Sequence, residues 1–266
     1  MLLICIPSGC VTPPGEFGIE GIRYFSNVRA NGPGIKKADD FSYTFNRCNG
    51  VYHALKKEYF LEFYHANKNV HERHLRSSNK GGIDDKKVDW ADLIYFETHG
   101  SRSDNAMLLL FNNNVDKWIG DSRDWELGNV DLEWLAIYAC DLIDRDTFGD
   151  KGYGRYHRFF HGLHMILTAW NGLWDGWTTD ECGEDFANNL LDGDSMKNAW
   201  FDGVSDWWCD QDPAVISAEV HETWNGGKPF LNQTTLFSDH FHGKGKVCED
   251  IAHEDVSWIG FWWVDD

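Results

Sequence analysis

A histidine and a cysteine each follow an apolar run in this 266-residue chain. His99 comes shortly after the apolar run at residues 91–96. The second run ends at residue 138 and is followed by Ala139 and then Cys140. A thiol near an imidazole can form a reactive thiolate, so this pair could carry out nucleophilic catalysis. Gly100 and Cys140 also carry backbone N–H groups that could hold a developing oxyanion. The less favoured alternative is that Cys140 is a small buried side chain and His99 an ordinary loop residue.

The elements that must position this pair are two strands. Residues 91–96 and 132–138 have the length and the residue types of buried strands. In an open parallel sheet, side chains just past the carboxyl ends of neighbouring strands meet in one crevice, where ligands bind. If the two strands are neighbours, His99 and Cys140 share that crevice.

Further elements are expected before, between and after these two strands. Asp39 or Asp40 could cap the first predicted helix, and Asp194 or Ser195 could cap the last. Strands that alternate with helices predict an α/β fold, in which helices cover the faces of a sheet. The apolar patterns predict strands at residues 18–25, 106–111, 164–170 and 214–220, and helices at 40–57, near 156–160 and in two pieces after 181.

The composition of the chain argues against several classes of partner. A net charge of −19 argues against nucleic acid and anionic membranes, because both require basic patches. No stretch approaches the length of a membrane span. Seven cysteines without Cys-x-x-Cys spacing argue against a disulfide scaffold or a zinc ribbon, and fourteen tryptophans predict a tryptophan-rich core. The compartment stays open between the cytoplasm and an exported form whose signal has been removed.

Close histidine pairs leave a metal-dependent hydrolase as an alternative. Residues 71–74 read His-Glu-Arg-His, one residue short of the zinc-protease motif, although His71 and His74 can still share a helix face. Twelve histidines produce such pairs by chance, so the favoured interpretation expects no metal and no other cofactor. The other possible metal ligands are His161 with His164, and Asp239 with His240 and His242.

The order of the two main motifs resembles the caspase-like cysteine peptidases, the group that includes legumains, gingipains and separases. In this chain and in those peptidases, an apolar strand is followed by His-Gly, and a later apolar strand is followed by Ala-Cys. Residues 88–101 are particularly similar to an uncharacterised microbial branch of this group. The resemblance implies an α/β, caspase-like three-layer sandwich with a mostly parallel central sheet and helices on both faces. It implies one domain over residues 18–266, with a C-terminal extension, after an irregular lead-in over residues 1–17.

The same resemblance implies a function. Cys140 and His99 would form a catalytic dyad, and Gly100 with Cys140 an oxyanion hole, for endopeptidase cleavage of a polypeptide through a thioester without a cofactor. The chain departs from the family pattern after the cysteine, where Asp141 stands beside the thiol and could raise its pKa. A catalytically inactive binding or assembly module with the same fold is therefore the second hypothesis.

Residues that follow the next predicted strand could line the substrate pocket. In caspase-like folds the strand after the cysteine strand usually contributes to the wall around the substrate side chain that precedes the scissile bond. By that resemblance Trp170 and Trp174 could form walls, and Asp175 could receive a basic side chain. The alternative is that the tryptophans pack in the core and that Asp175 is a turn residue, and for Asp175 we favour this alternative.

Overall fold

The first strand of the structure begins inside the predicted lead-in, at Glu16. The rest of that lead-in up to residue 14 lies outside the described residues, as do Cys5, Cys10 and Cys209. The computed structural model describes residues 15–25, 39–103, 106–112, 116–143, 154–205, 211–220, 223–225, 228–230 and 238–264.

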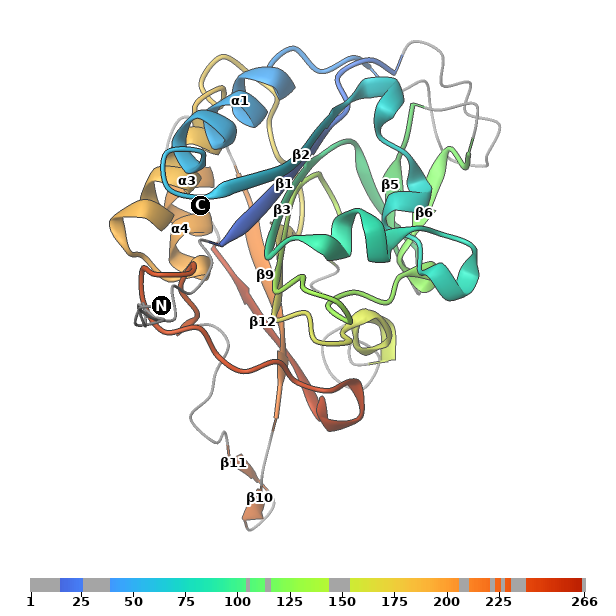
Figure 1. The fold of residues 1–266 in the computed structure, drawn as a ribbon, viewed down its shortest axis with the longest axis vertical. Coiled ribbons are helices and arrows are strands. Elements are labelled where there is room, and N and C mark those ends of the chain that lie inside the picture. The colour runs from blue at the N-terminus through green and yellow to red at the C-terminus, as the bar shows by residue number, and fades with distance from the viewer. Residues whose placement is uncertain are drawn as a thin grey trace, which may run out of the picture.

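A seven-stranded central sheet organises the described residues, in the order β12-β9-β8-β7-β3-β1-β2 (Figure 1). The strands β2, β1, β3, β7 and β8 run parallel to one another, whereas β9 is antiparallel to β8 and β12 is antiparallel to β9. The predicted mostly parallel sheet is thus confirmed. The bounds are β1 Glu16–Gly21, β2 Phe60–Ala66, β3 Leu93–Glu97, β7 Trp134–Tyr138, β8 Met165–Ala169, β9 Pro213–Glu219 and β12 Trp258–Trp263.

Two apolar layers sandwich the sheet, because successive side chains of a strand point to opposite faces. On one face, Leu93 and Trp134 pack under three helices: α1 (Thr44–Leu55), α3 (Cys182–Asp192) and α4 (Met196–Val204) (Figure 1). On the other face, Ile94 and Leu135 pack under short 3-10 helices and a small antiparallel sheet. The small sheet consists of β4 (Gly100–Ser103), β5 (Ala106–Leu110) and β6 (Ile119–Asp121). The predicted α/β sandwich is confirmed, with one of its helical layers built from single 3-10 turns.

The strands with continuous apolar sequence are the ones that periodicity predicts. The runs at 91–96, 132–138, 164–170 and 214–220 correspond to β3, β7, β8 and β9. The run at 106–111 is a strand, β5, but it belongs to the small sheet. The strands β2 and β12 are missed, although the sequence of β12, WIGFWW, is entirely non-polar. Both lie at edges of the central sheet, and most of their side chains are only partly buried or are exposed. A short β10 (Thr223–Asn225) pairs with β11 (Lys228–Phe230) apart from the sheet.

The start of α1 differs from the prediction. The helix begins at Thr44 rather than near residue 40, and Asp40 accepts a hydrogen bond from the backbone N–H of Phe25 (2.6 Å) instead of capping it. Asp175, distant in sequence, accepts hydrogen bonds from the backbone N–H groups just before α1, those of Ser42 (2.6 Å) and Tyr43 (3.1 Å). The free N–H groups at a helix start can bind a carboxylate from any segment that the fold brings close. The sequence around α1 therefore could not identify Asp175 as the partner.

The start of α4 agrees better with the prediction than the start of α1 does. Ser195 caps α4, since its side-chain oxygen accepts a hydrogen bond from the backbone N–H of Asn198 (3.4 Å). The predicted helix near 156–160 corresponds to α-helical residues 154–156 followed by a 3-10 turn over His157–Phe159. Within the described ranges, no helix has both the length and the apolar character needed to cross a membrane.

Asp89 is a fully buried carboxylic acid in the 3-10 turn Val88–Trp90 that precedes β3. Its oxygens accept hydrogen bonds from the backbone N–H groups of Gly128 (2.6 Å) and Asn129 (3.1 Å). Burial raises the pKa of Asp89 to about 7. The folded state therefore holds this proton more tightly than the unfolded state. The resulting stabilisation is complete below the ordinary aspartate pKa and is lost as the pH rises through about 7.

We expect the melting temperature of the protein to fall as the pH rises from about 5 to about 8, and the Asp89→Asn variant to show a flatter dependence. A shift of this size corresponds to roughly 4 kcal/mol of pH-dependent stability, at about 1.4 kcal/mol per pKa unit. Burial also raises the pKa values of Glu133 and Glu219 to about 7, and both act in the same direction. Thermal denaturation across pH tests this, with Asp202→Asn at an exposed aspartate as the control. If the melting temperature falls equally steeply with pH in Asp89→Asn and in Asp202→Asn, Asp89 is not the source of the pH dependence.

Candidate active site

The strands that precede His99 and Cys140 are direct neighbours in the sheet. The parallel register of β3 and β7 pairs Leu93 with Trp134 and Glu97 with Tyr138. His99 and Cys140 each follow this last pair by two residues. The backbone N–H of Thr98 still donates to the Tyr138 carbonyl oxygen, at 3.3 Å, so the two chains stay adjacent past the end of the strands. The condition that the sequence analysis left open, that these two strands are neighbours, is therefore met.

Gly100 lies against the backbone of Cys140. A Cβ atom added at Gly100 would stand 2.1 Å from the Cys140 carbonyl oxygen and 3.1 Å from the Ala139 Cβ, so only glycine permits this approach. The backbone N–H of Leu110 donates to the His99 carbonyl oxygen (2.9 Å), which makes Gly100 and Leu109 a non-hydrogen-bonded pair of the β4–β5 ladder. The Gly100 N–H therefore points away from β5 and is not used in that ladder.

The His99 ring is held between two phenylalanines. Its centroid lies 4.5 Å from that of Phe25 and 4.0 Å from that of Phe41. Its Nε2 lies 2.8 Å from the Asp39 carbonyl oxygen, and because a carbonyl can only accept, Nε2 carries the hydrogen. Burial lowers the pKa of His99, so the ring is neutral near pH 7 and its Nδ1 keeps a lone pair. This nitrogen is the one that can accept a proton.

The thiol of Cys140 is half-buried and is held by one backbone unit. Its Sγ accepts a hydrogen bond from the Leu173 N–H (3.3 Å) and donates one to the Leu173 carbonyl oxygen (3.4 Å). Burial raises the pKa of the Cys140 thiol, and the negative charge of Asp141 raises it further. The direction agrees with what the sequence suggested for Asp141. In this state the thiol is protonated near neutral pH.

Asp141 forms a tight turn directly after the cysteine. It has a φ of +57°, a left-handed conformation that non-glycine residues seldom adopt and that tends to occur at functional sites. Its backbone N–H donates to the Asn171 carbonyl oxygen (2.7 Å), and its carboxylate pairs with Arg102 Nη1 at 3.0 Å. The same Arg102 nitrogen lies 2.9 Å from the Trp170 carbonyl oxygen, so the turn is fastened to the end of β8.

The three residues expected to line a substrate pocket have different environments. The Trp174 side chain is 62% exposed, whereas Trp170 is half-buried and packs partly against the core. The Asp175 side chain is only 16% exposed. In addition to its two backbone contacts before α1, the Asp175 carboxylate accepts a hydrogen bond from Arg47 Nη2 at 2.8 Å. Its oxygens are thus engaged by groups of this chain.

Arg47 is a buried cation that the sequence analysis did not identify as part of this site. Its guanidinium pairs with the fully buried carboxylate of Glu97, donates to Thr179 Oγ1 (3.1 Å), and lies 4.4 Å from the centroid of the Tyr138 ring. Glu97 and Tyr138 are the last residues of β3 and β7, so this ion pair lies directly behind the candidate dyad. The signal in the sequence was Glu97, an acid at the end of a buried strand that must find a partner.

The structure separates most of the histidine pairs that the sequence suggested as metal ligands. His164 is buried and bonded through Nδ1 to Asp239 (2.5 Å), whereas His161 stacks on His253 with ring centroids 4.1 Å apart. Among the described residues, ligand atoms of histidine, cysteine or acidic side chains lie within 4.8 Å of one another in three groups: Glu20 with His65 and His74, Asp92 with Glu133 and His242, and Glu16 with Asp92 and Asp131.

Comparisons with known proteins give a structural likeness and a family. The solved structure of pro-sf-caspase-1 aligns with a TM-score of 0.42 and 13% identity, covering 72% of this chain and 76% of that one. Caspase-1 from Spodoptera frugiperda aligns with a TM-score of 0.34 and 14% identity, covering 67% of each chain. No curated protein matches this chain. A family model described as a domain of unknown function, DUF6345, matches residues 19–266, and the chain therefore belongs to the DUF6345 family.

Proposed function

We propose that this protein is a caspase-like cysteine endopeptidase with Cys140 and His99 as its catalytic dyad. The observation that supports the proposal is that His99 and Cys140 each follow one of two neighbouring parallel strands by two residues, while Gly100 lies against the Cys140 carbonyl. Such an arrangement would bring a nucleophile, a base and a backbone N–H that the β4–β5 ladder does not use to one edge of the sheet. The finer assignment, to an uncharacterised microbial branch of caspase-like peptidases, rests on the sequence of residues 88–101.

In the proposed reaction, Cys140 Sγ bonds to the carbonyl carbon of the scissile peptide and its proton passes to His99 Nδ1. The backbone N–H groups of Gly100 and Cys140 stabilise the tetrahedral oxyanion. His99 then gives the proton to the leaving amine, and a thioester remains on Cys140. Water hydrolyses this thioester, which releases the acid product and returns the proton to the sulfur.

The resting state described above is latent in this proposal. The Cys140 thiol must first leave its two hydrogen bonds to Leu173, because they occupy the sulfur, while burial and the charge of Asp141 raise its pKa. Leu173 lies in the same loop as Trp174, whose exposed ring is a suitable apolar wall for a peptide, with Trp170 as a second wall. Peptide binding against this loop would then release the thiol. Asp175 would shape the wall through Arg47 rather than receive a basic substrate side chain.

The test is alkylation of the folded protein with iodoacetamide across pH, read for each cysteine by peptide mass spectrometry. We expect His99→Ala to slow the labelling of Cys140 by about tenfold or more, because the imidazole supplies the base. His53→Ala, which removes an exposed histidine of α1, is the matched control and should leave the rate unchanged. A Cys140→Ser variant should also lose cleavage of a peptide library. Retained peptide cleavage in Cys140→Ser, or equal Cys140 labelling in the wild type and in His99→Ala when the library peptides are present, would refute the dyad.

A catalytically inactive binding or assembly module is the second candidate function. The specific observation in its favour is the raised pKa of the Cys140 thiol, together with the Leu173 contacts that occupy the sulfur. In that case Cys140 is a packing residue, its labelling does not depend on His99, and no peptide is cleaved. Cleavage of the peptide library, together with labelling in its presence, therefore separates the two candidates without knowledge of the natural substrate.

A further inference from the structure

We propose that Glu20, His65 and His74 form a binding site for a divalent transition-metal ion of the Zn²⁺ type. One ligand atom from each of the three side chains lies within 4.8 Å of the other two. This group is independent of the proposed dyad. It also differs from the His71–His74 pair that the sequence suggested, because it joins His74 to two residues of the central sheet.

The fold brings these residues together from three segments. Glu20 is near the carboxyl end of β1, and the parallel register pairs it with His65 in the edge strand β2, so the two side chains lie on the same face. His74 belongs to the 3-10 turn Glu72–His74, which covers that face. Its Nδ1 lies 2.5 Å from Glu20 Oε1. No short sequence spacing joins the three residues, which is why a motif search does not find them.

Glu20 gives the independent indication that a ligand is required. Its side chain is fully buried, and its second oxygen, Oε2, has no hydrogen-bond partner. An unpartnered buried carboxylate oxygen is costly, because the oxygen has lost its water without a replacement. A metal ion between Glu20 and the two imidazoles would satisfy it. Two histidines and one carboxylate are also a donor set that zinc commonly takes, with a fourth position left for water.

The imidazole rings at the site lie close together. The ring centroid of His74 lies 5.3 Å from that of His65 and 5.1 Å from that of His71. A histidine binds a metal through the lone pair of one ring nitrogen, so two of these rings can approach one ion.

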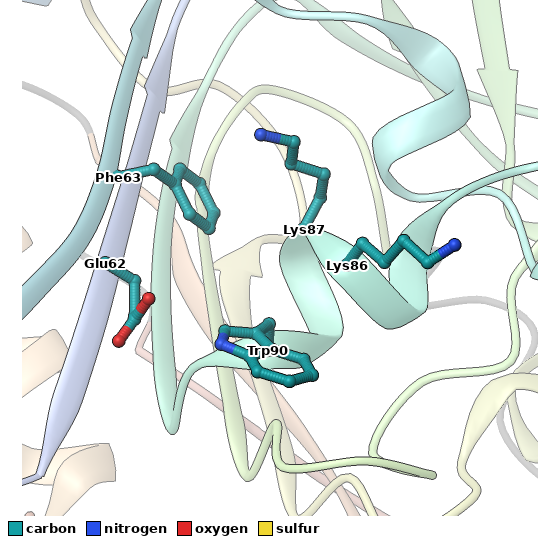
Figure 2. Close-up of a pocket in the computed structure, with 5 residues that line it drawn as sticks. All are labelled: Glu62, Phe63, Lys86, Lys87 and Trp90. Carbon is teal, nitrogen blue, oxygen red and sulfur yellow. The ribbon is translucent and has the colours of Figure 1, made fainter.

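Lys87 is the group that competes with a metal. Its Nζ lies 3.2 Å from His65 Nε2, so in this state the ammonium donates to that lone pair. Figure 2 shows the Lys87 side chain extending past the Phe63 ring, beside a pocket of about 300 Å³ lined by Glu62, Phe63, Lys86, Lys87 and Trp90. The pocket gives the flexible lysine space to move into when a metal takes its place on His65.

The experiment is a titration of the chelator-treated full chain with Zn²⁺ by isothermal calorimetry, with Co²⁺ absorption as a readout of tetrahedral coordination. We expect one high-affinity site in the wild type. Glu20→Gln and His65→Ala should each weaken it by about tenfold or more, since even outer residues of metal sites contribute that much. Lys87→Met should strengthen Zn²⁺ binding, because it removes the competing ammonium. Zn²⁺ should also raise the melting temperature of the wild type.

Two control variants make the result specific. His53→Ala removes an exposed histidine, and His242→Ala removes the histidine of the Asp92–Glu133 group; both should leave the Zn²⁺ affinity unchanged. Circular dichroism shows whether each variant is folded. If Glu20→Gln fails to fold, the half-buried His65 decides the question. Wild-type affinity in His65→Ala, or loss of binding only in His242→Ala, would overturn the proposal.

Discussion

Replacement of Arg47 by methionine is expected to lower the free energy of unfolding by about 3–5 kcal/mol. The guanidinium is fully buried between Glu97 and Asp175 and also donates to Thr179. Methionine fills much of the same space but leaves the Glu97 carboxylate buried without its cation. Removal of one partner of a buried pair costs far more than the pair itself contributes, because the remaining charge is uncompensated.

The control and the rescue variant make this prediction specific. Arg73→Met removes an exposed arginine and should change the unfolding free energy by less than about 0.5 kcal/mol. The double variant Arg47→Met/Glu97→Gln should recover part of the loss, because the orphaned charge is gone. Chemical denaturation measures all three variants. If the double variant is no more stable than Arg47→Met alone, the cost comes from lost packing of Arg47 and not from the buried charge.

Substitution of Gly100 by alanine is expected to destabilise the protein by about 1–3 kcal/mol and to change the reactivity of Cys140. The new Cβ would stand 2.1 Å from the Cys140 carbonyl oxygen, and this contact is with backbone that cannot rotate away. The turn after β7 must therefore move, and the thiol moves with it. Denaturation and iodoacetamide labelling of Cys140 measure the two effects on the same sample.

Gly172→Ala is the matched control for this variant. Gly172 lies in the loop that also carries Leu173, but a Cβ atom there would meet nothing within 4 Å. Its replacement should change stability by less than about 0.5 kcal/mol and leave Cys140 labelling as in the wild type. If Gly100→Ala and Gly172→Ala behave alike, the close approach of Gly100 to Cys140 does not position the thiol.

Buried strands and the positions where they end could be predicted from residue types. The strands β3 and β7 have continuous apolar sequence because both faces of a parallel sheet are covered, and such runs are recognisable without a structure. The edge strands β2 and β12 were not predicted; β2 contains polar residues, and most side chains of both strands are only partly buried or are exposed. Prediction therefore succeeded where burial constrains the sequence most.

The contacts between distant segments had no local signal. Asp175 approaches the start of α1 although Asp39 and Asp40 stand closer in sequence, and Arg47 is the partner of Glu97. A carboxylate or a guanidinium is satisfied by whichever opposite charge the fold delivers, so residue type shows that a partner is needed without naming it.

By itself the sequence determined the α/β class and the placement of His99 and Cys140 after two buried strands, because hydrophobic periodicity and strand ends are local properties. Only the tertiary structure decided that these strands are neighbours, that Leu173 holds the thiol, and that Glu20 meets His65 and His74. The physical reason is that strand order and side-chain contacts depend on how the whole chain packs, which no short segment encodes.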